Sequence, residues 1–137
     1  MKTRVLPLLI GAAVFLFATA AFSHHSLAGT YVLDQSKTIE GTVIDFVMRN
    51  PHSFVTVEVQ DAAGNAQRWG IEWAGTTVLR NAGIDPTSLK VGEKVSIMGN
   101  AARDTSERKL LMQRIERPGN GLIWEGIVGN RSNPTQP

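Results

Sequence analysis

Three observations predict a small, mainly β protein. Several short stretches alternate apolar and polar residues with the two-residue period of a strand. These stretches are rich in β-branched and aromatic residues, and Gly, Pro, Asn and Asp separate them. Residues 75–83 instead have an apolar side spaced as in a short helix. The expected domain therefore consists of five short strands and one short helix.

The first strand is expected at residues 37–48, "KTIEGTVIDFVM". Alternation divides its apolar side chains between two faces, with Ile39, Val43 and Val47 on one and Ile44, Phe46 and Met48 on the other. Gly41 indicates a bend or a bulge, which a barrel strand needs. Pro51 has no amide proton to donate, so residues 49–52, "RNPH", interrupt the sheet.

The second and third strands are expected at residues 53–60 and 66–73, joined by the turn "DAAGN". Each of the two strands has one apolar face, made by Val55, Val57 and Val59 in the first and by Trp69, Ile71 and Trp73 in the second. The helix follows, with Thr76 or Thr77 as its cap and Gly83 at its end. The fourth and fifth strands are expected at residues 94–100 and 109–117, after a loop whose Leu89 enters the core.

This order of three strands, one helix and two strands matches the OB-fold, a five-stranded Greek-key barrel. An unrelated small barrel or sandwich is the alternative. The sequence divides into a signal peptide at 1–23, an N-terminal segment at 24–36, the barrel at 37–117 and a flexible tail at 118–137.

The first 23 residues have the layout of a cleavable secretory signal. Lys2 and Arg4 precede an apolar stretch, and Ala21-Phe22-Ser23 provides small residues for a cut before His24. Cuts after residue 20 or 21 also fit, and a retained membrane anchor is the alternative, although residues 5–22 are short for a membrane span. We expect a periplasmic or secreted protein that is not an integral membrane protein after cleavage.

Charge and cysteine content exclude several classes of function. Removal of the leader leaves equal numbers of basic and acidic residues, so we expect no nucleic-acid partner. The chain has no cysteine, and therefore neither a disulfide nor a thiol nucleophile. It contains no Gly-x-Ser-x-Gly motif. Glu58 and Glu72 are a conceivable acid–base pair across two strands, but exposed surface positions are favoured, so we expect a protein that is not an enzyme.

The three histidines, His24, His25 and His52, are the candidate metal ligands. After a cut before His24, the new α-amine and the His24 imidazole together form a chelate. A site made only of nitrogen ligands suits copper best, followed by nickel or zinc. Asn50 and Pro51 would orient the loop that carries His52. In the alternative interpretation, the histidine pair is a polar terminus and His52 bonds to nearby backbone.

Asn50, Trp69 and Trp73 are candidate ligand-binding residues. OB-folds stack bases or sugars on aromatic side chains of the strands that contain these tryptophans. The interpretation that both tryptophans fill the barrel core is favoured over this one, because Ile71 lies between them on the same face.

Four motifs resemble those of a family of small exported bacterial proteins catalogued as a domain of unknown function. They are "HHS" at the expected mature start, "GTV" in the first strand, "NPH", and "SLKVGEKVSIMG" before and within the fourth strand. The resemblance covers roughly residues 24–116. It implies a periplasmic β-barrel and brings no established activity. Leu27 stands where that family usually has an aromatic residue.

The sequence therefore predicts an exported protein that binds a transition metal or a small ligand near the three histidines. The alternative is an interaction module of an envelope assembly. Such a module would use open strand edges or residues 121–126, "GLIWEG", to bind another envelope protein.

Overall fold

A computed structural model of the chain describes residues 27–119, 121–126 and 128. The chain divides into two compact units, Met1–Thr30 and Tyr31–Pro137. In the first unit, residues 27–30 form a helical turn. The second unit contains the strands and one short helix, which are β1 (Tyr31–Val47), β2 (Ser53–Gln60), β3 (Ala66–Trp73), α2 (Thr76–Asn81), β4 (Lys94–Ala102), β5 (Lys109–Arg117) and β6 (Gly121–Glu125).

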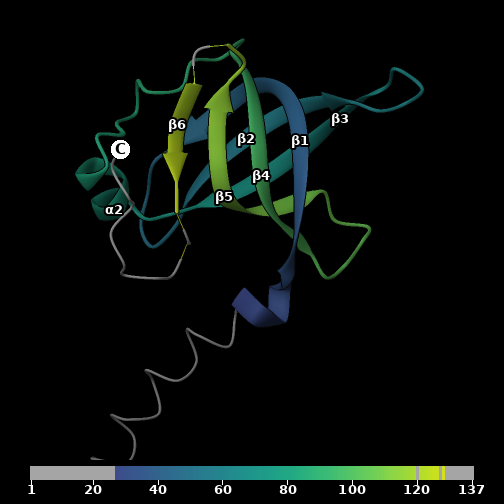
Figure 1. The fold of residues 1–137 in the computed structure, drawn as a ribbon, viewed down its shortest axis with the longest axis horizontal. Helices are drawn as coiled ribbons and strands as arrows, with labels where there is room; N and C mark the ends of the chain where they lie inside the picture. Colours follow the sequence, from purple (N-terminus) through teal and green to yellow (C-terminus); the bar gives the residue numbers. More distant parts are fainter. Residues whose placement is uncertain (1–26, 120, 127, 129–137) are drawn as a thin grey trace, which may run out of the picture. The chain divides into compact units, whose positions relative to one another are not determined.

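The strand pairing closes the sheet into a barrel (Figure 1). The order is β3-β2-β1-β4-β5-β6, and every neighbouring pair in this order is antiparallel. The ring is closed by a parallel pairing between β3 and β5, in which Gly70 lies opposite Lys109. Five strands in this arrangement, with a helix between β3 and β4, define an OB-fold. The predicted mainly β, OB-like fold is therefore confirmed.

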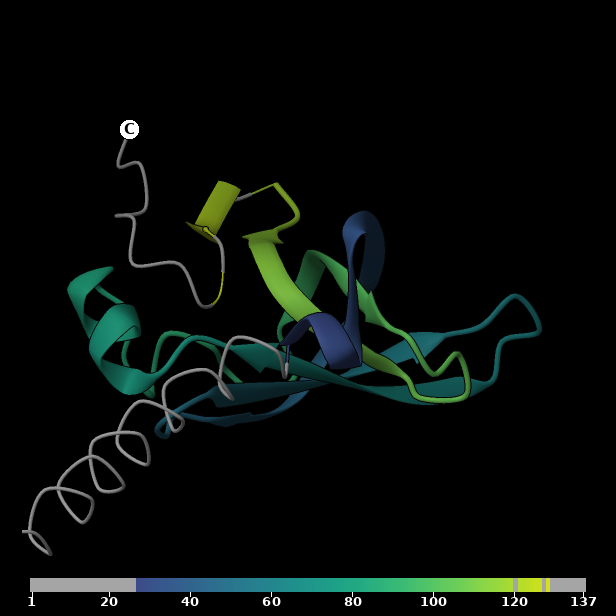
Figure 2. The same ribbon diagram turned by 90° about the horizontal axis from the view of Figure 1, so that it is seen from below.

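The core is made by the inward faces of the barrel strands. Val55 and Val57 of β2 are fully buried, as the alternation predicts, and so is Ile71 of β3. The helix and the loop after it contribute Leu79 and Leu89, which are also buried. In Figure 2, α2 and the β2–β3 turn lie at opposite ends of the sheet.

The strand β1 differs from the prediction in its start and in its faces. It begins at Tyr31 rather than at residue 37, and Val47 is exposed although Ile39 and Val43 are buried. The reason is a bulge between Val43 and Asp45, where one extra residue reverses the alternation. The expected irregularity therefore lies shortly after Gly41.

The first residues of β1 are held by a buried side chain of β4. The register between β1 and β4 shifts between Tyr31 and Ser36. The side-chain amide of Asn100, which is 4% exposed, donates to three backbone carbonyls in this interval: those of Val32, Leu33 and Gln35. Asn100 thus satisfies carbonyls that the shifted ladder does not pair.

The helix α2 is capped from another part of the chain. It begins after Gly75, which has no side chain to cap it. Both the amide and the hydroxyl of Thr76 donate to the side-chain oxygen of Asn50, at 3.0 and 2.8 Å. The prediction that a threonine side chain caps this helix is therefore wrong. Gly83 follows the helix with a positive φ of 77°, which suits its expected role at the helix end.

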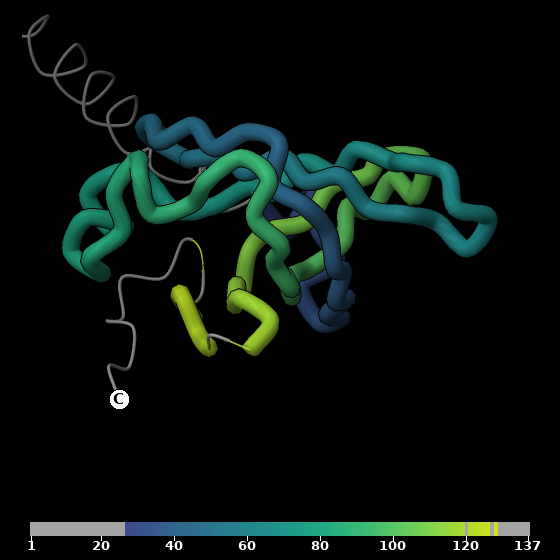
Figure 3. The backbone as a smooth tube through the Cα atoms, turned by 90° about the horizontal axis from the view of Figure 1, so that it is seen from above, coloured from purple at the N-terminus to yellow at the C-terminus, as the bar shows by residue number. Residues whose placement is uncertain are grey.

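The segment that the sequence predicts as a tail contains the sixth strand, β6. It pairs with β5 at the edge of the sheet, with Trp124 opposite Ile115 (Figure 3). Trp124 is 5% exposed and meets Trp73 edge to face, with ring centroids 5.5 Å apart. The sequence did not predict this strand, because its apolar run is only three residues long and its flanks are rich in Gly and Asn. No helix among the described residues has the length and hydropathy that crossing a bilayer requires.

Candidate functional site

His52 lies in the loop between β1 and β2, which is anchored at both ends. The hydroxyl of buried Ser53 donates to the carbonyl oxygen of Arg49 and accepts from its amide, each at 3.3 Å. Asn50 binds Thr76 of α2, and the Asn50–Pro51 peptide bond is cis. These contacts hold the backbone on either side of His52. Its side chain is 30% exposed, so solvent reaches part of the imidazole.

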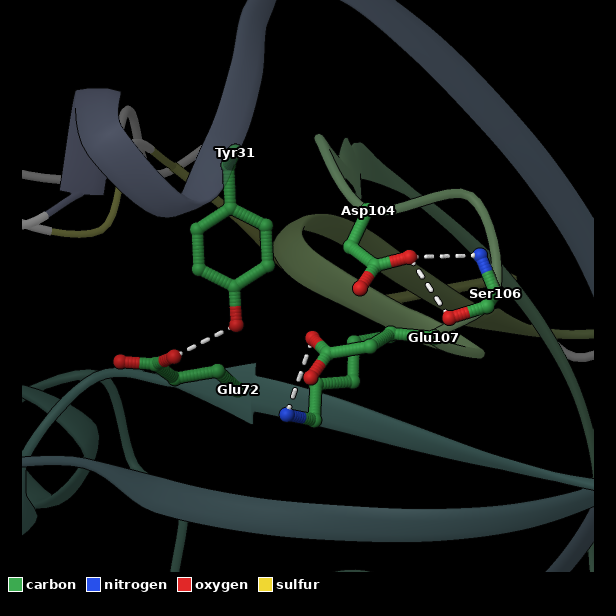
Figure 4. Close-up of polar contacts among 6 residues, drawn as sticks. Tyr31, Glu72, Asp104, Ser106 and Glu107 are labelled. Carbon is green, nitrogen blue, oxygen red and sulfur yellow. Dashed lines mark hydrogen bonds and ion pairs between the residues drawn. The ribbon is translucent and has the colours of Figure 1, made fainter.

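Glu72 of β3 lies beside His52 and is mostly buried. Its side chain is 15% exposed, and its Oε1 forms an ion pair with Nδ1 of His52. Pairing of Ser53 with Trp73 places the two residues at the same end of the β2–β3 ladder. The other carboxylate oxygen, Oε2, accepts a hydrogen bond of 2.6 Å from the hydroxyl of Tyr31 (Figure 4).

Tyr31 completes a chain of three polar side chains from β1, β3 and the β1–β2 loop. Its side chain points from the start of β1 toward Glu72 (Figure 4) and is 2% exposed. Burial is the main cause that raises the pKa of the Tyr31 hydroxyl, followed by the hydrogen bond to Glu72 and the negative charges of Glu72 and Glu107. Tyr31 is therefore a hydrogen-bond donor at physiological pH.

This arrangement leaves one imidazole nitrogen of His52 available. A carboxylate at Nδ1 favours the tautomer that carries its proton on that nitrogen. No group in the described part of the chain bonds to Nε2. A histidine that binds a metal usually has this support, with a carboxylate that orients the ring and increases the basicity of the ligating nitrogen.

The site lies on the face that OB-folds use for ligands, formed by strands 2 and 3 and two neighbouring loops. The β4–β5 loop docks on β3, because the amide of Gly70 donates to Arg108 and the Arg108 guanidinium donates to Gln67. In the same region, Glu107 pairs with Lys109 at 3.1 Å. The β4–β5 loop is thus held against the strand that carries Glu72.

The three predicted ligand-binding residues have different surroundings from one another. Trp73 is completely buried between Phe46 and Trp124, so its ring is not available to a ligand. Trp69 is half-buried, and Lys37 lies over its ring at 4.5 Å from the centroid. Asn50 uses its side-chain oxygen on α2. These three residues do not form one binding surface.

Only one of the three predicted metal ligands can be located. His24 and His25 lie outside the described residues. Within residues 27–119, 121–126 and 128, no group of three or more His, Asp or Glu side chains is arranged to hold a metal ion. His52 as a metal ligand stays a prediction, now with an observed carboxylate partner.

Glu72 and Tyr31 are the residues that sequence reasoning missed. Glu72 is not paired with Glu58, because the register sets it opposite Phe54 and sets Glu58 opposite Arg68. The sequence did contain one usable signal. If residues 53–60 and 66–73 form a hairpin about "DAAGN", His52 and Glu72 must lie at the same end of it. Tyr31 gave no comparable signal, because it is 41 residues from Glu72.

The fold and site thus define an OB-type barrel in which a histidine is paired with a carboxylate. The chain belongs to a family of unknown function (DUF6152), whose model matches residues 13–111. This confirms the predicted membership in a domain family of unknown function. None of the curated proteins matches the chain. Among solved structures, it is similar to Rim1, a mitochondrial single-stranded DNA binding protein from S. cerevisiae. The identity is 16% and the TM-score 0.47, over 64% of this chain and 97% of that one.

Proposed function

We propose that this chain is an exported, non-enzymatic protein that binds a transition metal through Nε2 of His52. The observation that carries this proposal is the Glu72 carboxylate at Nδ1, which fixes the imidazole and leaves Nε2 for a metal. The partial exposure of His52 gives an ion access to the ring. The leader layout of residues 1–23 supports export to the periplasm.

The remaining ligands in this proposal are His24, with its α-amine after cleavage, and His25. His25 precedes Tyr31 by six residues, a length of chain that spans at most about 20 Å when extended. Tyr31 contacts Glu72, and Glu72 contacts His52, so chain length permits the N-terminal histidines to reach the same ion. Nitrogen ligands favour copper(II) over nickel or zinc.

The test uses the processed chain that begins at His24. Isothermal titration with copper(II), nickel(II) and zinc(II) is compared for the wild type, for His52→Ala and for a chain extended at its N-terminus by one alanine. We expect the tightest binding with copper, and weaker binding in both altered chains. Lys90→Ala, at an exposed loop position, is the control. Equal copper affinity in the wild type and His52→Ala would contradict the proposal.

A second candidate, an interaction module of an envelope assembly, is favoured by one observation. β6 is the last strand in the order, so among the described strands one of its edges has no partner. Open edges accept an added strand from another protein. Leu122 of β6 is 47% exposed. If this candidate is right, Leu122→Lys abolishes cross-linking to a co-purified envelope protein and leaves copper binding unchanged. Cross-linking that persists would argue against it.

A further inference from the structure

A polar hollow lies on the outer face of the barrel, where β1 passes from its pairing with β4 to its pairing with β2. Its volume is about 370 Å³. Thr42 lies at its centre, since this residue pairs with both Glu58 of β2 and Lys94 of β4. Its lining includes five polar side chains and one apolar ring: Glu40, Thr42, Glu58, Gln60, Lys94 and Pro118.

The polar side chains of this hollow have no partners among the residues that the structure describes. In the part of the chain that the structure describes, none of the five forms a hydrogen bond or an ion pair with another protein group. Glu93, the neighbour of Lys94 in the sequence, behaves differently, because it is bound by Arg117. The hollow therefore keeps two carboxylates, an ammonium, an amide and a hydroxyl available to a ligand.

The composition of the hollow selects a class of ligand. Two carboxylates repel an anion, and Lys94 repels a cation. Glu40 and Glu58 belong to no group of three metal-ligating side chains among the described residues. A neutral ligand with many hydroxyl groups satisfies both kinds of side chain, because each hydroxyl donates to a carboxylate and accepts from an ammonium or amide. The ring of Pro118 adds an apolar surface.

We propose that this hollow binds a neutral saccharide of one or two rings. Its volume is near the lower end of the roughly 300–1,000 Å³ typical of small-molecule sites. Sugar hydroxyls would lie against Glu40, Glu58 and Lys94, and the apolar face of a ring against Pro118. None of these residues belongs to the His52 site, so this proposal does not depend on metal binding.

The test is an NMR titration of the ¹⁵N-labelled processed chain with cellobiose. Glucose 6-phosphate serves as the anionic comparison. We expect cellobiose to shift the amide signals of Gly41, Thr42 and Val95 in a saturable way, and glucose 6-phosphate to shift them less. Glu58→Gln and Lys94→Met should each weaken binding about tenfold, since the first replaces a charged acceptor with a neutral one and the second removes a donor.

Asp34→Asn and Lys90→Met are the matched controls, because both residues are exposed and lie outside the hollow. Both should bind as the wild type does, and all four variants should keep the wild-type melting temperature. Two results would overturn the proposal. One is no saturable shift up to about 50 mM cellobiose, far above the millimolar range of weak complexes. The other is wild-type affinity in both Glu58→Gln and Lys94→Met.

Discussion

The carboxylate of Glu72 is shared by two donors of different kinds. Its Oε1 is paired with an imidazole that solvent can reach, and its Oε2 accepts from a phenol that solvent cannot reach. The buried donor fixes the carboxylate, and the carboxylate in turn fixes the ring of His52. Tyr31 and Glu72 are therefore the supporting residues, and His52 is the one that would meet a ligand.

Replacing Glu72 with Gln tests that support. The variant keeps the shape of the side chain but removes the charge that orients His52, so copper affinity should fall roughly 10- to 100-fold. Isothermal titration of the processed chain measures the change. Glu58→Gln is the control, because Glu58 lies on the same outer face opposite Arg68 and does not contact His52. An unchanged affinity in Glu72→Gln would show that the carboxylate does not support a metal ligand.

Tyr31→Phe should remove a pH dependence of stability. The folded protein raises the pKa of this phenol, so it stays protonated where the unfolded chain ionises, near pH 10. Its contribution to stability is therefore present below that pH and is lost as the pH rises, because the unfolded state releases a proton that the folded state keeps.

Urea unfolding between about pH 9 and 11 measures this effect. The free energy of unfolding should fall more steeply with pH in the wild type than in Tyr31→Phe. The difference between the two proteins reports on this phenol alone, because Tyr31 is the chain's single tyrosine. Parallel curves for the two proteins would mean that the hydroxyl is not buried against Glu72.

At the scale of elements, the β1–β2 loop and α2 stabilise each other through Asn50. Asn50→Ala removes the acceptor for the amide and hydroxyl of Thr76, so the free energy of unfolding in urea should fall by about 1 kcal/mol. Asn50→Asp keeps an acceptor and should restore most of the stability. Asn81→Ala, at an exposed position of the same helix, is the matched control and should change little. A larger loss in Asn81→Ala than in Asn50→Ala would contradict this capping role.

The strand β6 is attached through Trp124, whose indole nitrogen has an unusual environment. Neither this nitrogen nor that of Trp73 has a hydrogen-bond partner among the described residues, although both are buried. Trp124→Ala removes a buried ring and should cost about 3–5 kcal/mol in the free energy of unfolding. Trp124→Phe keeps a ring and removes an unpaired donor, so its cost should be under about 2 kcal/mol. Equal losses for the two variants in urea unfolding would indicate that the indole N–H has a partner.

At the scale of the whole molecule, the continuity of the barrel sheet depends on how closely β4 and β5 approach at the bulge between Met98 and Gly99. A Cβ atom at Gly99 would lie 2.3 Å from the backbone oxygen of Leu111, so Gly99→Ala must move one strand. We expect the free energy of unfolding to fall by about 1–3 kcal/mol. Gly70→Ala is the control, because the nearest atom to its Cβ would be Lys109 Cγ at 4.0 Å. Equal effects of the two substitutions on urea unfolding would show that the close approach of β4 and β5 does not require a glycine.

The sequence predicted the elements whose pattern is local. Alternation set β2 and β3 at the residues where the structure has them, and the apolar run of residues 110–112 set β5. The order of elements indicated the OB-like class. It did not predict the face of Val47, because a bulge breaks the alternation. It did not predict β6, because an edge strand needs only one apolar side chain facing the core.

The sequence alone was enough to name His52 as a candidate ligand and to identify the family, because both depend on short motifs such as "NPH". The sequence did not predict that the carboxylate of Glu72 and the phenol of Tyr31 support His52. Their contacts join the start of β1, the end of β3 and the β1–β2 loop, and only strand register and barrel closure bring these together. Alternation specifies which side of a strand a residue faces. What it meets there is decided by the neighbouring strands, which lie far away in the sequence.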